Sequence, residues 1–525
     1  MKEFNTTGVC IPEKHYMVDI SNKLDQIESL VEKGKYFTIN RPRQYGKTTS
    51  MHLLEKRLEA KDYLPIFISF EGIGDDVFKA EDKFCRTLLS IIKRDLNYKK
   101  GQTYKEFIEE HLDKVENFAQ LDDFIFNYIE KVDKRVVLMI DEVDKSSNNQ
   151  LFLSFIAMLR DKYLRRELKK DKTFHSVLLA GVYDVKNLKL KLRADEEKKY
   201  NSPWNIAVDF EVEMDFNTEE IASMLKAYQE EKKSINDIEK ITDKLYYYTS
   251  GYPYLVSKLC QIIDEKIIVD RENKEWTEKD VDEAVKIFLN MNSVNFDSLI
   301  KNLENDQRLY EFVESIIYDG KKVTYNQNNE LINKGEMFGI LENKDGLVKV
   351  HNRIYEQLIY DYMSTNIEIN NLSQKDMNFY NYKENFITDQ GYLDFEKILD
   401  KFQLFIKEEY SEKDKDFLER NGRLVFLAFI KPIINGKGFD FKEVQISQEK
   451  RLDVVITYLD KKYIVELKVW RGEKYHQTGL KQLNDYLGIQ NVDKGYLLSF
   501  DFNKNKEYKQ ERIKLKDKEI YAVWV

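Results

Sequence analysis

A glycine, a lysine and two threonines stand together at Gly46-Lys47-Thr48-Thr49, where chemistry on phosphate groups is possible. Residues 37–39 have the apolar pattern of a buried strand, and apolar residues recur at helical spacing after Thr49. A loop between a strand and a helix presents backbone N–H groups and the helix N-terminus to an anion. Lys47 would neutralise phosphate charge, and the Thr48 hydroxyl would bind Mg²⁺. The stretch therefore predicts a phosphate-binding loop.

The loop departs in one place from the usual nucleotide-binding pattern. Arg41 stands five residues before Gly46, where that pattern has another glycine. Because a Gly-Lys-Thr triplet also begins ordinary helices by chance, this motif alone does not establish nucleotide binding. The residues that we expect to contact the nucleotide are Arg41, Pro42, Arg43, Gln44, Tyr45, Gly46, Lys47, Thr48 and Thr49.

A pair of carboxylates supports the same chemistry. Five apolar residues at 136–140 predict a strand buried on both faces, and Asp141 and Glu142 follow it directly. Asp141 would hold Mg²⁺ through water, and Glu142 would orient and polarise the attacking water. The alternative is a strand that ends in a solvated acidic turn. The two motifs occur in the order that nucleotide hydrolysis requires, so together they predict ATP binding.

A third group of ionisable residues lies near the C-terminus. Two strands are predicted at 452–458 and 463–469, and twelve residues separate Asp453 on the first from Glu466 on the second. Glu466 and Lys468 are two residues apart and so share one face of their strand. Burying such a pair is costly unless the charges serve a purpose. The pattern predicts a metal-dependent site, and the alternative is a structural ion pair between Asp453 and Lys468.

The elements expected to position these residues alternate between strands and helices. Further strands are predicted at 64–70, 176–182, 207–212, 439–446, 495–500 and 520–525. Helices are predicted at 22–33, within 80–132, at 149–167, 237–248, 307–318, 327–335, 353–364, within 375–435 and at 474–487. Short strands at 337–342 and 346–351 would form a hairpin. The fold class is therefore α/β and multidomain.

The chain is too long for one hydrophobic core. We predict an ATPase core at 1–215, a helical lid at 216–295, a winged-helix-like domain at 296–368 and a C-terminal α/β domain at 375–525. The net charge of −9 argues against a globally basic nucleic-acid binder but leaves a local basic groove open.

The three cysteines show no metal-binding spacing and no disulfide framework, which fits a reducing cytoplasm. The first residues lack the apolar core of a signal peptide. No apolar run approaches the length of a membrane span. We therefore expect a cytoplasmic protein without a membrane partner.

Several stretches of the N-terminal half together resemble AAA-like ATPases, close to the archaeal and STAND branches of the P-loop NTPases. They are NRPRQYGKT, the apolar strand that ends in DEVD, LAGVYD, SPWNIA and the TSGYP helix junction. The resemblance implies ATP and Mg²⁺ as cofactors. It places phosphate and Mg²⁺ at Lys47 and Thr48, Mg²⁺ at Asp141, and a catalytic base at Glu142. It also places a polar sensor at the end of the strand at 176–182, where Tyr183 and Asp184 stand in place of the usual Asn, Ser or Thr.

The C-terminal pattern resembles the PD-(D/E)XK nuclease superfamily, with a restriction-endonuclease-like α/β fold. The resemblance implies that Asp453 and Glu466 bind Mg²⁺, with Mn²⁺ as an alternative, and that Lys468 activates the attacking water. It further implies a glutamate on a preceding helix, for which we choose Glu419, and a glutamine at Gln482.

Three functions stay open at this point. The leading hypothesis is an ATP-dependent or ATP-gated nuclease that acts on DNA or RNA in defence or mobile-element control. The first alternative is a STAND-like signalling switch whose C-terminal domain is an effector or an inactive scaffold. The second is a nucleic-acid-binding ATPase with an inactive nuclease-like domain. The expected partners are ATP and nucleic acid, and a homo-oligomer is left open.

Overall fold

The computed structural model describes most of the chain, and its unbroken stretches are longest before residue 372. The described residues are 2–99, 102–146, 149–182, 204–232, 234–235, 237–317, 323–372, 386–409, 422, 425–427, 429–430, 433–434, 438–441, 454–458, 461–470, 472–489, 492–503, 506–515 and 517–525. They fall into two compact units: Met1–Asn302 with Tyr325–Ile354, and Leu303–Thr324 with Tyr355–Val525. The predicted bounds of the four domains remain a prediction.

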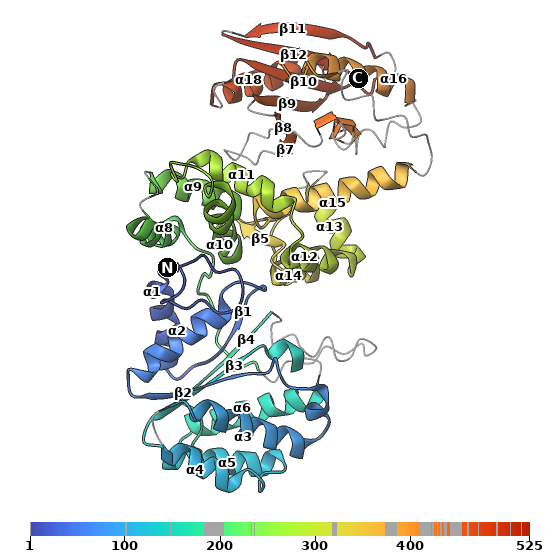
Figure 1. Ribbon diagram of the computed structural model, residues 1–525. Coiled ribbons are helices and arrows are strands. Elements are labelled where there is room, and N and C mark those ends of the chain that lie inside the picture. The colour runs from blue at the N-terminus through green and yellow to red at the C-terminus, as the bar shows by residue number, and fades with distance from the viewer. Residues whose placement is uncertain are drawn as a thin grey trace. The chain divides into compact units, whose positions relative to one another are not determined.

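A parallel sheet forms the centre of the first unit (Figure 1). Its strands are β1 (Tyr36–Asn40), β2 (Tyr63–Ser69), β3 (Arg135–Asp141) and β4 (Ser176–Gly181), in the spatial order β1-β4-β3-β2. The last residue of β1, Asn40, pairs with Gly181, and Ser69 at the end of β2 pairs with Asp141. The carboxyl ends of all four strands therefore meet at one edge of the sheet, as in a P-loop ATPase fold.

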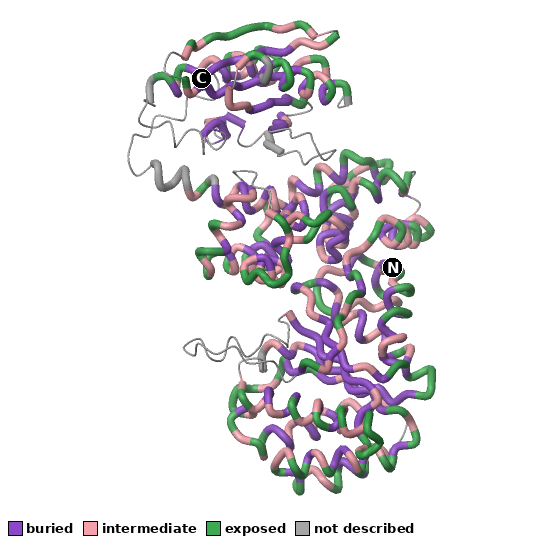
Figure 2. The backbone as a smooth tube through the Cα atoms, turned by 180° about the vertical axis from the view of Figure 1, so that it is seen from behind, coloured by how far each residue is buried: buried purple, intermediate pink, exposed green. Residues whose placement is uncertain are grey.

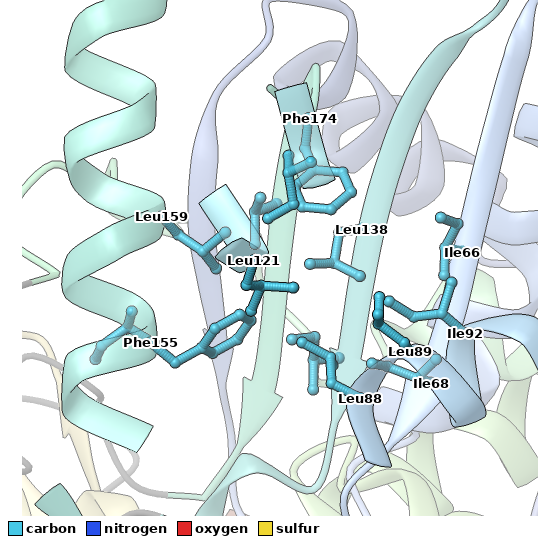
Figure 3. Close-up of a cluster of buried hydrophobic side chains, with 14 of the residues drawn as sticks. Ile66, Ile68, Leu88, Leu89, Ile92, Leu121, Leu138, Phe155, Leu159 and Phe174 are labelled. Atoms are coloured by element: carbon cyan, nitrogen blue, oxygen red, sulfur yellow. The ribbon is translucent and has the colours of Figure 1, made fainter. Parts of the chain in front are cut away.

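Helices cover both faces of this sheet because its strands are apolar on both sides. Helices α1 (Ser21–Glu32) and α2 (Lys47–Glu59) bury Leu24, Leu54 and Leu58 against one face. The other face meets α3 (Glu81–Leu96), α5 (Phe118–Lys131) and α6 (Gln150–Glu167), and Figure 3 shows their side chains packed on Ile66, Ile68 and Leu138. A fully buried aliphatic side chain contributes about 1.5–3 kcal/mol. In Figure 2 the strands are accordingly buried, while the outer surfaces of the helices are exposed.

The prediction of a strand at 207–212 was wrong. Only one isolated bridge forms there, between Val208 and Phe37, and the Val208 amide donates to the carbonyl of Tyr36. The alternating sequence suggested a strand, but one hydrogen bond to β1 does not build a ladder. Trp204 anchors the segment instead, because its buried indole N–H donates to the Thr38 hydroxyl at 3.0 Å.

A helical region follows the sheet: α8 (Thr218–Lys232), α9 (Ile238–Thr249), α10 (Pro253–Ile262), α11 (Glu278–Leu289) and α12 (Val294–Glu304). The predicted junction between α9 and α10 is present, with Ser250 and Gly251 at φ 47° and 79°. A Cβ on Gly251 would lie 2.0 Å from the Phe216 carbonyl oxygen, so the turn requires glycine. Among the described residues, no helix combines the length and apolarity needed to cross a bilayer.

The predicted hairpin is present in the first unit but starts later than expected. Helix α14 (Glu330–Met337) continues to Met337, and the strands are β5 (Leu341–Lys344) and β6 (Leu347–Val350). Gly339 has φ 71° and ends the helix, which the apolar sequence at 337–342 did not indicate. Asp345 and Gly346 form the turn with positive φ angles.

The second unit contains a mixed sheet of parallel and antiparallel strands. It comprises β7 (Gly438–Phe441), β8 (Val454–Tyr458), β9 (Lys461–Val469), β10 (Lys494–Phe500), β11 (Gln510–Leu515) and β12 (Lys518–Trp524) in the order β11-β12-β10-β9-β8-β7. Strands β9, β10 and β12 are parallel to one another, whereas the pairs β11–β12, β8–β9 and β7–β8 are antiparallel. The sequence did not predict β11, because this edge strand is mostly exposed and polar. The described helices of the unit include α13 (Gln307–Ile317), α16 (Phe395–Glu409), α18 (Glu473–Ile489) and most of α15 (Arg353–Leu372).

The two faces of the C-terminal sheet meet different helices. Ile464 and Leu497 pack with Leu483 of α18. On the opposite face, Phe395 of α16 contacts the rings of Tyr463 and Tyr496. Since side chains alternate along a strand, Glu466 and Lys468 share the face of Ile464 and lie on the α18 side.

Candidate functional site

The loop between β1 and α2 has the backbone form of a phosphate-binding loop. Gly46 is the residue before α2 and has φ 73°, a left-handed conformation that glycine adopts without strain. Gln44 also has a positive φ, of 60°. The sharp turn brings Lys47, Thr48 and Thr49 into the first turn of the helix. There the free backbone N–H groups favour an anion.

Lys47 is buried beneath this loop, with 7% of its surface exposed. Its ammonium group donates to the carbonyl oxygens of Arg41 and Pro42, each at 2.9 Å. Burial lowers the pKa of Lys47, while the nearby carboxylates of Asp144 and Glu142 oppose that shift. A phosphate would add negative charge directly beside this buried cation.

Two hard oxygen donors meet at the carboxyl end of β3. The Thr48 hydroxyl donates to Asp141 Oδ2 at 2.6 Å, and Asp141 is 2% exposed. Oxygen donors of this kind suit Mg²⁺, so the two residues fit the ion predicted here. Glu142 lies beside them with φ 55°, and its amide donates to Asp141 Oδ1 at 2.9 Å. Burial and the Asp141 charge raise the pKa of Glu142.

Arg41, the departure from the usual loop pattern, has structural partners in the segment before α8. Its guanidinium donates to the carbonyls of Asn40 and Val212 at 3.0 and 2.9 Å and lies over the Phe210 ring. These contacts tie the start of the loop to residues 210–212. A contact of Arg41 with nucleotide stays a prediction.

A cavity of about 560 Å³ adjoins the loop. It is lined by the N-terminal segment, the loop and the helical region, including Tyr16, Gly46, Thr49, Tyr254 and Lys258. This volume is ample for a nucleoside, since small-molecule sites span about 300–1,000 Å³. Tyr16 lines the cavity, whereas His15 accepts a hydrogen bond from the Ile11 amide.

Four consecutive loop residues contact partners outside the sheet, which the sequence did not reveal. The pairs are Pro42 with Gly339, the Arg43 carbonyl with the Tyr252 hydroxyl, Gln44 with Asn295, and Tyr45 with His351. Only Tyr252 belongs to one of the quoted family motifs, the TSGYP junction. The other partners carry no local signal because they are hundreds of residues away in sequence.

The end of β4 is held by the last aspartate of the acidic motif. Asp144 Oδ2 accepts from the Val182 amide at 2.6 Å. A Cβ on Gly181 would approach Asp144 Oδ1 to 2.7 Å, so a larger residue there would require the Asp144 side chain to shift. The predicted sensor positions Tyr183 and Asp184 lie outside the described residues.

Three predicted site residues of the C-terminal unit come together. Lys468 Nζ lies 2.7 Å from Glu466 Oε1 and donates to Gln482 Oε1 at 3.4 Å. Glu466 is completely buried, whereas the Lys468 side chain is 19% exposed. Gln482 reaches the pair from α18, on the sheet face deduced from strand alternation.

Asp453 and Glu419 lie outside the described residues. The described strand β8 begins at Val454, which pairs with Val465, the residue before Glu466. Within the described part of the chain, no group of three or more acidic, histidine or cysteine side chains could hold a metal ion. Glu466 alone offers one hard carboxylate ligand, and the roles of all five predicted residues stay predictions.

Comparisons with known proteins address both units. Residues 9–361 match the family model of the AAA-like domain, and residues 438–513 match the PD-(D/E)XK nuclease superfamily. No curated protein matches the sequence.

Solved structures resemble part of the chain at low sequence identity. The Walker-type ATPase of Pyrococcus abyssi is 13% identical with a TM-score of 0.46, covering 68% of this chain and 99% of its own. The ORC2 protein of Aeropyrum pernix is 13% identical with a TM-score of 0.37, covering 69% and 98%. A RuvB variant of Thermotoga maritima is 14% identical with a TM-score of 0.32, covering 65% and 95%. On the family match, the chain belongs to the AAA-like ATPase family, and it carries a C-terminal domain of the PD-(D/E)XK nuclease superfamily.

Proposed function

We propose that this protein is an ATP-hydrolysing, ATP-gated nuclease that cuts nucleic acid with a divalent metal. The observation that carries the proposal is the contact between Lys468 Nζ and the buried Glu466 Oε1, at 2.7 Å. The same chain has a second set of site residues at one edge of the parallel sheet: Lys47, Thr48, Asp141 and Glu142. The cellular role that the family resemblance suggests, defence or control of mobile elements, is part of this proposal.

The ATPase half of the proposal assigns each residue one task. Lys47 would neutralise charge on the β- and γ-phosphates, and Thr48 and Asp141 would hold Mg²⁺. Bound Mg²⁺ supplies charge neutralisation at the transferred phosphoryl group. Glu142, whose pKa is raised by burial and by Asp141, would accept a proton from the attacking water.

The nuclease half rests on the second buried site. Asp453 and Glu466 would hold Mg²⁺ or Mn²⁺, which lowers the pKa of bound water. Lys468 would position the water or stabilise charge on the phosphorane, and Gln482 would fix the lysine through their 3.4 Å hydrogen bond. DNA and RNA both carry the phosphodiester that this arrangement would attack.

One observation favours a second function, a STAND-like switch with an inactive nuclease-like domain. Glu466 has no exposed surface, and Lys468 lies directly on it. An ion pair of this kind can be purely structural. In that case the C-terminal domain would bind a partner or nucleic acid without cutting it.

Cleavage assays separate the two functions. Plasmid, single-stranded DNA and RNA are incubated with the purified chain and Mg²⁺ or Mn²⁺, with and without ATP. We expect the full chain to cleave nucleic acid at a rate that ATP changes. Lys468→Ala should abolish this cleavage, and in Lys47→Ala the cleavage rate should no longer depend on ATP. Cleavage that survives Lys468→Ala would contradict the nuclease assignment. Nucleic-acid binding without cleavage under every condition would support the switch.

A further inference from the structure

The phosphate-binding loop is held from outside the ATPase sheet at four consecutive residues. Gly339 and His351 flank the β5–β6 hairpin, and Tyr252 and Asn295 belong to the helical region. A Cβ on Gly339 would lie 3.0 Å from Pro42, the Tyr252 hydroxyl donates to the Arg43 carbonyl at 2.7 Å, and Asn295 donates to Gln44 Oε1 at 2.8 Å. The loop that would bind phosphate is thus braced by residues distant in sequence.

The contact of Tyr45 belongs to a buried polar cluster of Tyr45, His351 and Asp215. The Tyr45 hydroxyl and His351 Nε2 share a hydrogen bond of 2.6 Å, and His351 Nε2 lies 3.5 Å from Asp215 Oδ1. Tyr45 is 4% exposed and His351 is 5% exposed. The ring of Tyr252 packs edge-on against the ring of Tyr45, with 4.6 Å between the ring centroids. Tyr45 directly precedes Gly46, so a shift of its side chain would move the turn that carries Lys47.

We propose that His351 is a positioning residue of the nucleotide site: through Tyr45 it fixes the phosphate-binding loop and couples nucleotide occupancy to the docking of the β5–β6 hairpin. The inference rests on the proposed ATP binding. It adds residues of the hairpin segment to a site that the sequence assigned to the loop, Asp141 and Glu142. Because coupling between two sites is reciprocal, nucleotide would tighten the hairpin as much as the hairpin tightens nucleotide.

The charges around His351 predict how this coupling depends on pH. Asp215 and Glu213 precede α8, Glu342 lies on β5, and Tyr45 completes the surroundings. Burial opposes the charged imidazolium, but the Asp215 carboxylate at 3.5 Å and the more distant carboxylates of Glu342 and Glu213 raise the pKa of His351 above its ordinary 6.5. The imidazolium–Asp215 attraction is therefore complete below pH 6.5 and is lost as pH rises through the higher folded-state pKa.

The test measures ADP and ATP affinity by calorimetry for the full chain, His351→Gln, Tyr45→Phe and the double variant. His111→Gln is the matched control, since His111 lies on α4 (Gln102–His111) and its Nδ1 bonds the Phe107 carbonyl. We expect His351→Gln to weaken affinity about tenfold, within the usual range of coupling between sites. The double variant should be little worse than either single variant, because both act through one contact. The affinity of the wild type, but not of His351→Gln, should fall as pH rises from about 6 to about 9.

Hydrogen exchange without nucleotide separates failure of this inference from failure of the proposed function. We expect faster exchange in residues 41–46 of His351→Gln than in the wild type or His111→Gln. If the wild type binds nucleotide while His351→Gln shows unchanged affinity, pH profile and exchange, the positioning role is wrong and ATP binding stands. If the wild type binds no nucleotide but His351→Gln still loosens the loop, the ATP proposal fails and the contact stands. Additive effects in the double variant would also overturn the proposed route through Tyr45.

Discussion

The Thr48 hydroxyl donates a 2.6 Å hydrogen bond to Asp141 Oδ2 and so joins the first turn of α2 to the end of β3. The two residues come from different motifs, 93 positions apart. Parallel strands bring them together, because the loop after β1 and the end of β3 lie at the same sheet edge, with β4 between the two strands. The site thus depends on the strand order as much as on either motif.

This contact predicts that Thr48→Ala weakens the binding of Mg·ATP more than that of metal-free ATP. The substitution removes an oxygen ligand while leaving the backbone N–H groups that meet the phosphates. Calorimetry with and without Mg²⁺ measures the difference, and Thr48→Ser, which keeps the hydroxyl, should restore it. Equal losses in both conditions would show that Thr48 serves the loop and not the metal.

Lys47→Ala should abolish ATP hydrolysis. It removes the buried cation that would neutralise the β- and γ-phosphates. Phosphate release measures turnover, and Lys56→Ala is the control because Lys56 is exposed on the same helix. Wild-type turnover in Lys47→Ala would show that this loop does not bind nucleotide for hydrolysis.

Glu142→Gln should keep ATP bound but slow hydrolysis by about 10² or more, the usual size of a general-base effect. Burial and Asp141 raise the pKa of Glu142, so wild-type turnover should fall with acidification at a pH above the ordinary glutamate range. That acid limb should be missing from the residual activity of Glu142→Gln. Glu110→Gln, on the exposed surface of α4, is the matched control. A collapse of affinity with normal turnover per bound ATP would make Glu142 a binding residue instead.

The C-terminal site should lose cleavage in two distinguishable ways. Asp453→Ala should lose metal binding and cleavage together, because it removes a ligand. Lys468→Ala should keep metal but lose most cleavage. ATP hydrolysis should survive both changes. Lys461→Ala, at the other end of β9, is the control. Cleavage that both substitutions leave unchanged would contradict the metal-dependent mechanism.

The Glu466–Lys468 pair also predicts an effect on stability. Lys468→Met leaves a completely buried carboxylate without its cation, which costs about 3–5 kcal/mol. Adding Glu466→Gln removes the charge and should recover part of that loss. Calorimetric unfolding of the C-terminal unit measures both variants. A double variant less stable than Lys468→Met would show that the buried glutamate is stabilised by other partners.

Much of the fold could be predicted from the sequence because its signals are local. A run of five apolar residues that ends in Asp141 and Glu142 identifies a buried strand and its acidic end within one stretch. The Gly251–Pro253 junction and the Asp345–Gly346 turn rest on backbone preferences that those residues carry in any protein. The spacing of Glu466 and Lys468 fixes their common face, and their 2.7 Å contact confirms that they meet.

Only the tertiary structure decided which distant residues meet. Tyr45 and His351 lie 306 positions apart, and no local pattern connects them. In the sequence, Arg41 is only a departure from the loop motif, and the structure shows its hydrogen-bond partner, the Val212 carbonyl. The exposed strand β11 has no apolar periodicity to reveal it, and its place was set by pairing with β12. Local composition determines which segments become strands and helices. Pairing order and long-range packing determine which side chains share a site, because those contacts join residues that are far apart in the sequence.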